Sequence, residues 1–202
     1  DFAVPAPKGA NQVNARVIGV VENQAPTKAQ SATLDVKDGF VQPDQAQDVA
    51  RIALVERHRG TGDVVNGFVS GFQYQGQMAI ASTVAHDSHH MIVVGTSDSD
   101  MALAANRLAE IGGGVTVWQN GVELALVELP VAGLMSDSPA AEVAAKADAM
   151  VQAMATCGCS LNNAYMQHSL LALVVIPELR ISGLGLVDVT KFELTDLLAT
   201  SE

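Results

Sequence analysis

Charged residues are scarce in this chain, and basic residues are scarcer than acidic ones. Only 16% of the 202 residues are charged, and eleven Lys and Arg against twenty-two Asp and Glu give a formal net charge of −11. Nucleic acid and anionic membranes are bound through basic surfaces, so this balance argues against both as partners. A charged fraction below the roughly 25% of average soluble domains leaves few groups to cover a monomer, so we expect a homo-oligomer.

Long apolar runs and cysteines are also few. The longest uninterrupted apolar run, Leu170–Ile176, is far short of the roughly 18 residues of a transmembrane helix, and no basic segment precedes an apolar stretch near the start. We therefore expect a soluble, cytoplasmic protein. The two cysteines, Cys157 and Cys159, are too few for a disulfide framework, and no second Cys or His pair at zinc-site spacing accompanies them. We expect both thiols to be buried or inert.

Apolar residues, in contrast, are abundant. They make up 49% of the chain, enough to build a core that offsets the conformational entropy lost on folding. The chain starts with Asp1 rather than Met, and prolines follow at positions 5 and 7. We interpret residues 1–12 as a linker from an upstream domain and residues 13–202 as one domain.

Turn residues and apolar periodicity predict a mixed α and β structure. Two helices are expected, the first capped by Ser97 and ended by Gly112, the second opened by Pro139 and ended by Gly158. The buried stripe of the second helix is expected to consist of Val143, Ala147, Met150, Val151 and Met154. Short β-branched or apolar runs predict strands at 15–22, 33–36, 49–55, 78–85, 91–95, 115–119, 122–129 and 170–176.

The order of these elements predicts the fold class. Asn120-Gly121 is typical of a type I′ turn and joins two strands into a hairpin. A strand, a helix and a strand follow one another over residues 91–119, and a right-handed crossover makes these two strands parallel. We therefore expect an α/β or α+β fold, with a mixed β-sheet, a central β-α-β unit, flanking helices and β-hairpins.

Three of the five histidines lie in one segment, His86-Asp87-Ser88-His89-His90, between two expected strands. Loops at the end of a rigid sheet often carry functional side chains. Imidazole acts as a general acid or base near neutral pH and as a metal ligand, and Asp87 can orient a neighbouring ring. The segment predicts a functional loop, and His86, His89 and His90 are candidate ligands of a metal of their own. The alternative is a polar turn whose histidines bond to local carbonyls.

Other polar segments of the chain give weaker indications of a functional site. Glu56-Arg57-His58 follows the strand at 49–55 and is a second candidate site, although its pattern alone favours a solvated charge cluster. Gly112-Gly113-Gly114 follows a helix instead of opening one, so we interpret it as a helix stop and not as a phosphate loop. His168 is expected to be a core or edge histidine with satisfied hydrogen bonds. The chain has no His-x-His, Gly-x-Ser-x-Gly, Walker loop or dinucleotide fingerprint, so it carries no complete catalytic set.

A series of motifs, in order from about residue 50 to residue 180, gives the chain a specific resemblance. They are Val55-Glu56-Arg57-His58, Gly67–Phe72, Ala79–Ser82 with the following His86-Asp87-Ser88-His89, Met91–Gly95, Asp100-Met101, Gly112–Gly114, Leu129–Ser136 and Val175–Leu179. In these motifs the chain resembles the bacterial adenine deaminases of the amidohydrolase superfamily, and specifically the C-terminal domain that follows their metal-bearing barrel.

The resemblance implies hydrolytic deamination of adenine to hypoxanthine and ammonia in purine salvage. It also implies a divalent metal pair, manganese or iron, held by the enzyme's own N-terminal barrel, which these 202 residues lack, so the isolated chain is expected to be inactive. By position in the motif, the residues expected to close over that site and act in catalysis are His86, Asp87 and His89. Residues expected to support them or to bind substrate are Ser88, Glu56, Arg57 and His58.

One residue departs from the pattern, because His90 stands where Asn is expected after the second histidine of the motif. A family role that requires a side-chain amide at this position is therefore not carried over to this chain, whereas the roles of the preceding four residues are. The alternative to a deaminase part is a non-catalytic module of related sequence that binds a small molecule or forms oligomers.

Overall fold

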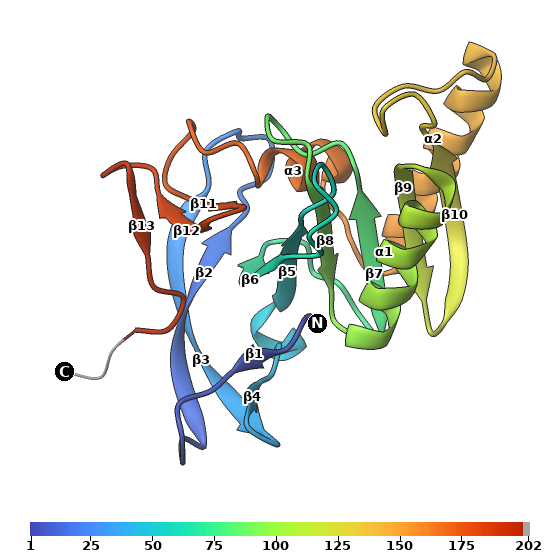
Figure 1. Cartoon of the computed structure of the whole chain (residues 1–202). Coiled ribbons are helices and arrows are strands. Elements are labelled where there is room, and N and C mark those ends of the chain that lie inside the picture. The colour runs from blue at the N-terminus through green and yellow to red at the C-terminus, as the bar shows by residue number, and fades with distance from the viewer. Residues whose placement is uncertain (200–202) are drawn as a thin grey trace.

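The computed structural model describes residues 1–199 and arranges its strands in two sheets (Figure 1). The large sheet has the order β1-β4-β3-β2-β6-β5-β8-β7-β9-β10. Its strands are β1 (Val4–Pro5), β2 (Gln12–Gly19), β3 (Lys28–Lys37), β4 (Phe40–Val41), β5 (Val49–Val55), β6 (Val64–Ser70), β7 (Met78–Ser82), β8 (Met91–Gly95), β9 (Gly114–Gln119) and β10 (Val122–Glu128). The small sheet consists of β11 (Leu179–Ser182), β12 (Gly185–Asp188) and β13 (Glu193–Thr195).

Three α-helices and a short 3₁₀-helix complete the described part of the chain. They are α1 (Asp98–Ile111), α2 (Ala140–Thr156), α3 (Ala164–Leu170) and η1 (Gln45–Gln47). The predicted fold class is confirmed, since this is an α+β arrangement of a mixed sheet with helices and hairpins. None of the helices within residues 1–199 is long and apolar enough to cross a membrane.

The predicted β-α-β unit is present, with one strand inserted. Strands β8 and β9, on either side of α1, both pair antiparallel with β7. They therefore run in the same direction, as predicted, but β7 lies between them in the sheet.

The central strands are buried on both faces. Successive side chains of a strand point to opposite faces, so Ile92 and Val94 join one hydrophobic cluster while Met91 and Val93 join another. The second cluster contains Met101, Ala104 and Leu108 of α1. The first contains residues of α2 and of the small sheet, namely Met150, Met154, Ile181 and Leu186. Helix α1 thus covers one face of the sheet, and α2 and the small sheet cover the other.

Local signals placed α1 and the hairpin correctly. The Ser97 hydroxyl accepts a hydrogen bond from the Asp100 N–H, and Gly112 ends the helix with φ 83°. Asn120 and Gly121 form the turn between β9 and β10 with φ 52° and 78°. The buried stripe of α2 is narrower than predicted. Val151 is 56% exposed, since this helix packs mainly on the edge strand β10 and buries only a narrow face.

The strand predicted at 170–176 is wrong. Residue 170 ends α3, residues 171–178 form turns, and the next strand begins only at Leu179. The guanidinium of Arg180, 1% exposed, donates hydrogen bonds to the carbonyls of Leu170 (3.0 Å), Ile176 (2.8 Å) and Ala25 (2.5 Å). These carbonyls are satisfied without a neighbouring strand, so the run can be compact instead of extended.

The first twelve residues, expected to be a linker, contain β1, which pairs with β4. Phe2 and Val4 are 8% and 4% exposed and pack in hydrophobic clusters of the core. The division into residues 1–12 and 13–202 stays a prediction.

Strand direction gathers the segments of interest at one end of the large sheet, the upper end in Figure 1. Strands β5, β7 and β10 end there, while β8 and β9, antiparallel to their neighbours, begin there. The segments at this end are 56–63, 83–90, 112–113 and 129–136. We call them together the histidine edge.

Candidate functional site

The loop after β7 is fixed by its own backbone and by α3. The His86 N–H donates to the Ser169 carbonyl (3.1 Å), and the His89 N–H donates to the Ala85 carbonyl (2.6 Å). The rings of His86 and His89 lie side by side, with centroids 5.8 Å apart, and Asp87 is exposed. Two of the predicted catalytic side chains therefore share one site on an anchored loop.

The neutral ring of His89 is held in one tautomer. Its Nδ1 accepts a hydrogen bond from the Ala85 N–H at 3.2 Å, so the proton of the neutral ring is on Nε2. Burial of the ring lowers the pKa of His89, and the neighbouring His86 and Arg57 lower it further. Around neutral pH the ring is a neutral hydrogen-bond donor through Nε2, and its Nδ1 is already occupied.

Arg57 and His58, from the segment after β5, hold this loop in place. Arg57 Nε donates to the His89 carbonyl (2.6 Å), and its Nη2 donates to the Ala132 carbonyl (3.0 Å). His58 Nε2 donates to the Ser88 carbonyl (2.6 Å). Both side chains act on main-chain carbonyls of consecutive loop residues, which is a positioning function.

Glu56 organises the turn that carries these two side chains. Its carboxylate accepts hydrogen bonds from the N–H groups of His58 (2.7 Å), Arg59 (2.8 Å) and Thr61 (3.1 Å). Desolvation raises the pKa of the Glu56 carboxyl, but these N–H groups outweigh it and lower the pKa to about 2. Glu56 is therefore ionised throughout the physiological pH range and serves the turn.

His90 lies apart from the other two loop histidines. Its ring centroid is 4.9 Å from that of His58, and a Cβ added at Gly183 would lie 3.1 Å from His90 Nε2. Burial lowers the pKa of His90, and the neighbouring His58 lowers it further. Within residues 1–199, no three His, Cys, Asp or Glu side chains come together to hold a metal ion. His86, His89 and His90 thus do not form a common ligand set in this arrangement.

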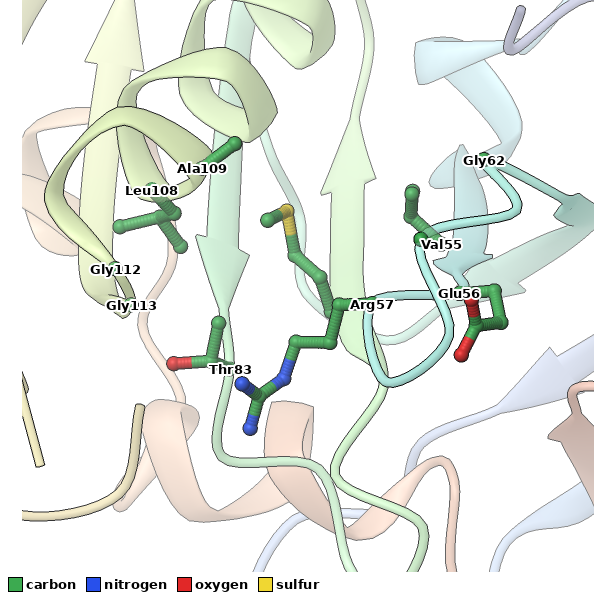
Figure 2. A pocket seen from close by; sticks show the side chains of 11 residues that line it. Val55, Glu56, Arg57, Gly62, Thr83, Leu108, Ala109, Gly112 and Gly113 are labelled. Carbon is green, nitrogen blue, oxygen red and sulfur yellow. The ribbon is translucent and has the colours of Figure 1, made fainter. Parts of the chain in front are cut away.

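A cleft of about 370 Å³ adjoins the loop (Figure 2). It lies between the end of α1 and the segment after β5, and Figure 2 shows the Arg57 guanidinium extending toward Thr83. Its apolar walls are Val55, Met91, Leu108 and Ala109. Among residues 1–199, Arg57 is the one cationic residue that lines this cleft, and its Nε and Nη2 donate to the carbonyls of His89 and Ala132.

The sequence did not predict the contact between the loops at 112–114 and 129–136, which lies beside this cleft. The Thr83 hydroxyl donates to the Gly133 carbonyl (2.6 Å) and accepts from the Gly114 N–H (2.8 Å). A Cβ on Gly113 would lie 2.4 Å from the Gly133 Cα, so the two loops approach closely only because residue 113 is a glycine. A Cβ on Gly133 would lie 2.9 Å from Arg57 Nη1, so glycine at position 133 leaves room for the guanidinium. Gly112 is a helix stop as predicted, but Gly113 serves this approach. Gly133 lies within the Leu129–Ser136 motif, which was the available signal.

Two buried features lie outside the loop. Cys157 and Cys159 are free and buried as predicted, and burial raises the pKa of the Cys157 thiol to about 11, which makes it unreactive. His168 on α3 is fully buried in the core, but neither ring nitrogen has a hydrogen-bond partner among residues 1–199, so the prediction of satisfied hydrogen bonds is wrong.

His168 predicts a specific loss of stability in acid. Burial lowers its pKa to about 3, whereas the unfolded chain has a histidine pKa of about 6.5. The folded state therefore excludes the charged ring, and stability that is complete above pH 6.5 is lost as the pH falls from 6.5 toward 3. The loss is about 1.4 kcal/mol for each pH unit, or roughly 2.5 kcal/mol at pH 4.5.

Urea unfolding of the His168→Leu variant and the parent at pH 7.5 and pH 4.5 measures this loss. On going from pH 7.5 to pH 4.5, the unfolding free energy of the parent should fall by about 2 kcal/mol more than that of the variant, because the variant has no imidazole ring to protonate. An equal difference at both pH values would contradict the prediction.

Sequence comparisons identify the family. The family of the adenine deaminase C-terminal domain matches residues 24–193. The chain is 74% identical to an adenine deaminase of Ruegeria pomeroyi over 199 residues, which are 98% of this chain and 33% of that protein. It is 75% identical to one of Roseobacter denitrificans (96% and 32%) and 46% identical to one of Moorella thermoacetica (98% and 33%). The chain spans about a third of the length of these relatives. It belongs to the adenine deaminase C-terminal domain family.

Proposed function

We propose that this chain is the C-terminal third of an adenine deaminase, an enzyme that hydrolyses adenine to hypoxanthine and ammonia. The observation that carries the proposal is the anchored loop at the histidine edge, which presents His86 and His89 together. The names of the relatives, which this chain matches over nearly its whole length, support the same reaction. The proposal extends to a role in purine salvage in the cytoplasm and, from the scarcity of charge, to a homo-oligomer.

The loop residues have distinct roles in this proposal. Water adds to the purine carbon that bears the amine, and the adjacent ring nitrogen gains negative charge as it does so. His89 Nε2–H donates to that nitrogen and stabilises the charge, in the manner of an oxyanion-hole donor. His86 and Asp87 assist proton transfer to the departing amine. Ser88, Glu56, Arg57 and His58 position the loop.

The metal belongs elsewhere in the protein. Residues 1–199 bring no ligand set together, and His89 Nδ1 and His58 Nε2 are already engaged in hydrogen bonds. A manganese or iron pair therefore does not fit the described residues of this chain, and we place it in the N-terminal part of the enzyme. The roles given to the loop residues do not depend on it.

Grafting tests the proposal. This chain would replace the corresponding third of the Ruegeria pomeroyi enzyme, and ammonia release from adenine would be measured after supplying divalent metal. The graft should deaminate adenine, because the loop completes the site, whereas the 202-residue chain alone should not. The matched control is the same enzyme without its last third. Full activity in that truncated control would overturn the proposal and favour a non-catalytic module.

A further inference from the structure

Large apolar side chains are exposed at the histidine edge, where the loop lies, and in a turn beside it. In the turn after β10, Val131 is 43% exposed, Leu134 is 36% exposed and Met135 is 60% exposed. In the turn between β11 and β12, Leu184 is 83% exposed. Exposed apolar residues are common one at a time, but several that surround one polar site indicate a surface that another body covers.

Hydrogen bonds and contacts connect both turns to the histidine loop. Arg57 bonds to the carbonyls of Ala132 and His89, so the turn after β10 is one side chain away from the loop. A Cβ added at Gly183, next to Leu184, would lie 3.1 Å from His90 Nε2, so this turn lies beside the His90 ring. The apolar side chains therefore flank the loop on two sides and share a fixed geometry with it.

The relatives indicate what covers this surface. They are about three times as long as this chain, and the matching family is the C-terminal domain of such proteins. A covalently joined body of about two thirds of the relatives' length is therefore available to cover this domain. If the histidine loop faces a substrate held by that body, the contact has to surround the loop.

We propose that Val131, Leu134, Met135 and Leu184 form the surface that seats the N-terminal two thirds of the enzyme and closes the histidine loop against it. The proposal rests on the proposed function, because the loop is taken to serve a site in that part. The four side chains form apolar parts of the contact from which solvent is excluded, on two sides of the polar loop.

Radical oxidation in the grafted enzyme tests the surface without reference to activity. The oxidation rate of each residue would be measured in the folded enzyme and divided by its rate in the denatured enzyme. For Met135 and Leu184 this rate ratio should be at least about threefold lower than their exposure in this chain predicts, since the core of an interface excludes solvent. The matched control is Val122, 58% exposed at the opposite end of β10, which should not be protected further.

The outcomes separate this proposal from the proposed function. A graft that deaminates adenine while Met135 and Leu184 oxidise as readily as Val122 overturns the surface and leaves the function standing. A graft that is inactive but protects both residues supports the surface and counts against the function. The measurement is repeated at dilutions where light scattering shows a single copy. Protection that disappears there assigns the surface to a second copy and overturns the proposal.

Discussion

Replacing His89 with Asn should lower kcat/KM for adenine deamination by about 100-fold, the effect of removing one fixed donor from a developing charge. His89→Gln should retain most of the activity. The amide nitrogen of Gln reaches the place of the imidazole Nε2, which is the donating atom, whereas the shorter amide of Asn reaches only the place of Nδ1. Both variants would be made in the grafted enzyme, with ammonia release and thermal melting measured beside the parent.

His90→Asn is the control in the same loop. The His90 ring faces His58 and Gly183 and not the His86 and His89 pair, so this change should alter kcat/KM by less than about threefold, far below the 100-fold or more typical of a lost acid or base. Equal activity of His89→Asn and His89→Gln would contradict the donor role. Full activity of the double variant His86→Ala and His89→Ala would eliminate the loop from catalysis.

The parts of the fold that could be predicted from sequence depend on neighbouring residues. The Ser97 cap, the Gly112 stop and the Asn120-Gly121 turn each act within a few residues, and the structure places α1 and the β9–β10 hairpin accordingly. The direction of β8 and β9 followed from the handedness of crossovers, but the insertion of β7 between them is a long-range choice that no local pattern encodes.

In the candidate site, too, local sequence features could be predicted and long-range contacts could not. Clustered histidines indicated the loop at 86–90, because packing rarely requires three such rings together. The positioning role of Glu56-Arg57-His58 could not be predicted, since the sequence pattern alone favoured a solvated charge cluster. Its side chains reach carbonyls about thirty residues away only because β5 pairs with β8, which begins directly after the loop. The tautomer of His89 depends on one backbone N–H and could not be read from sequence.

The wrong prediction of a strand at 170–176 has a different cause. Its apolar run has no periodicity that separates a buried strand from compact turns. Its conformation depends on Arg180, a buried cation that donates hydrogen bonds to the carbonyls of the first and last residues of the run, Leu170 and Ile176, and to the carbonyl of Ala25. The region therefore depends on one side chain that lies outside the misread segment.

Arg180→Met should destabilise the chain by about 3–5 kcal/mol, because it leaves the carbonyls of Ile176 and Ala25 without their donor in a buried region and removes one of the two donors to the Leu170 carbonyl. Burial lowers the pKa of Arg180 to about 10, so the lost group is a charged donor at neutral pH. Arg180→Lys keeps the charge but not the planar fork that reaches three acceptors, so it should recover only part of the loss. Urea unfolding at pH 7.5 measures both variants.

The matched control for Arg180 is Arg59→Met, which removes an exposed arginine and should change the unfolding free energy by no more than about 0.5 kcal/mol. A second readout follows from the position of α3. Its Ser169 carbonyl anchors the His86 N–H, and its last residue, Leu170, is one of the three acceptors. Hydrogen exchange at the His86 amide should therefore speed up in Arg180→Met more than exchange in α1, which packs on the other face of the sheet. A variant as stable as the parent, with His86 protection unchanged, would show that the turns at 171–178 hold together without this arginine.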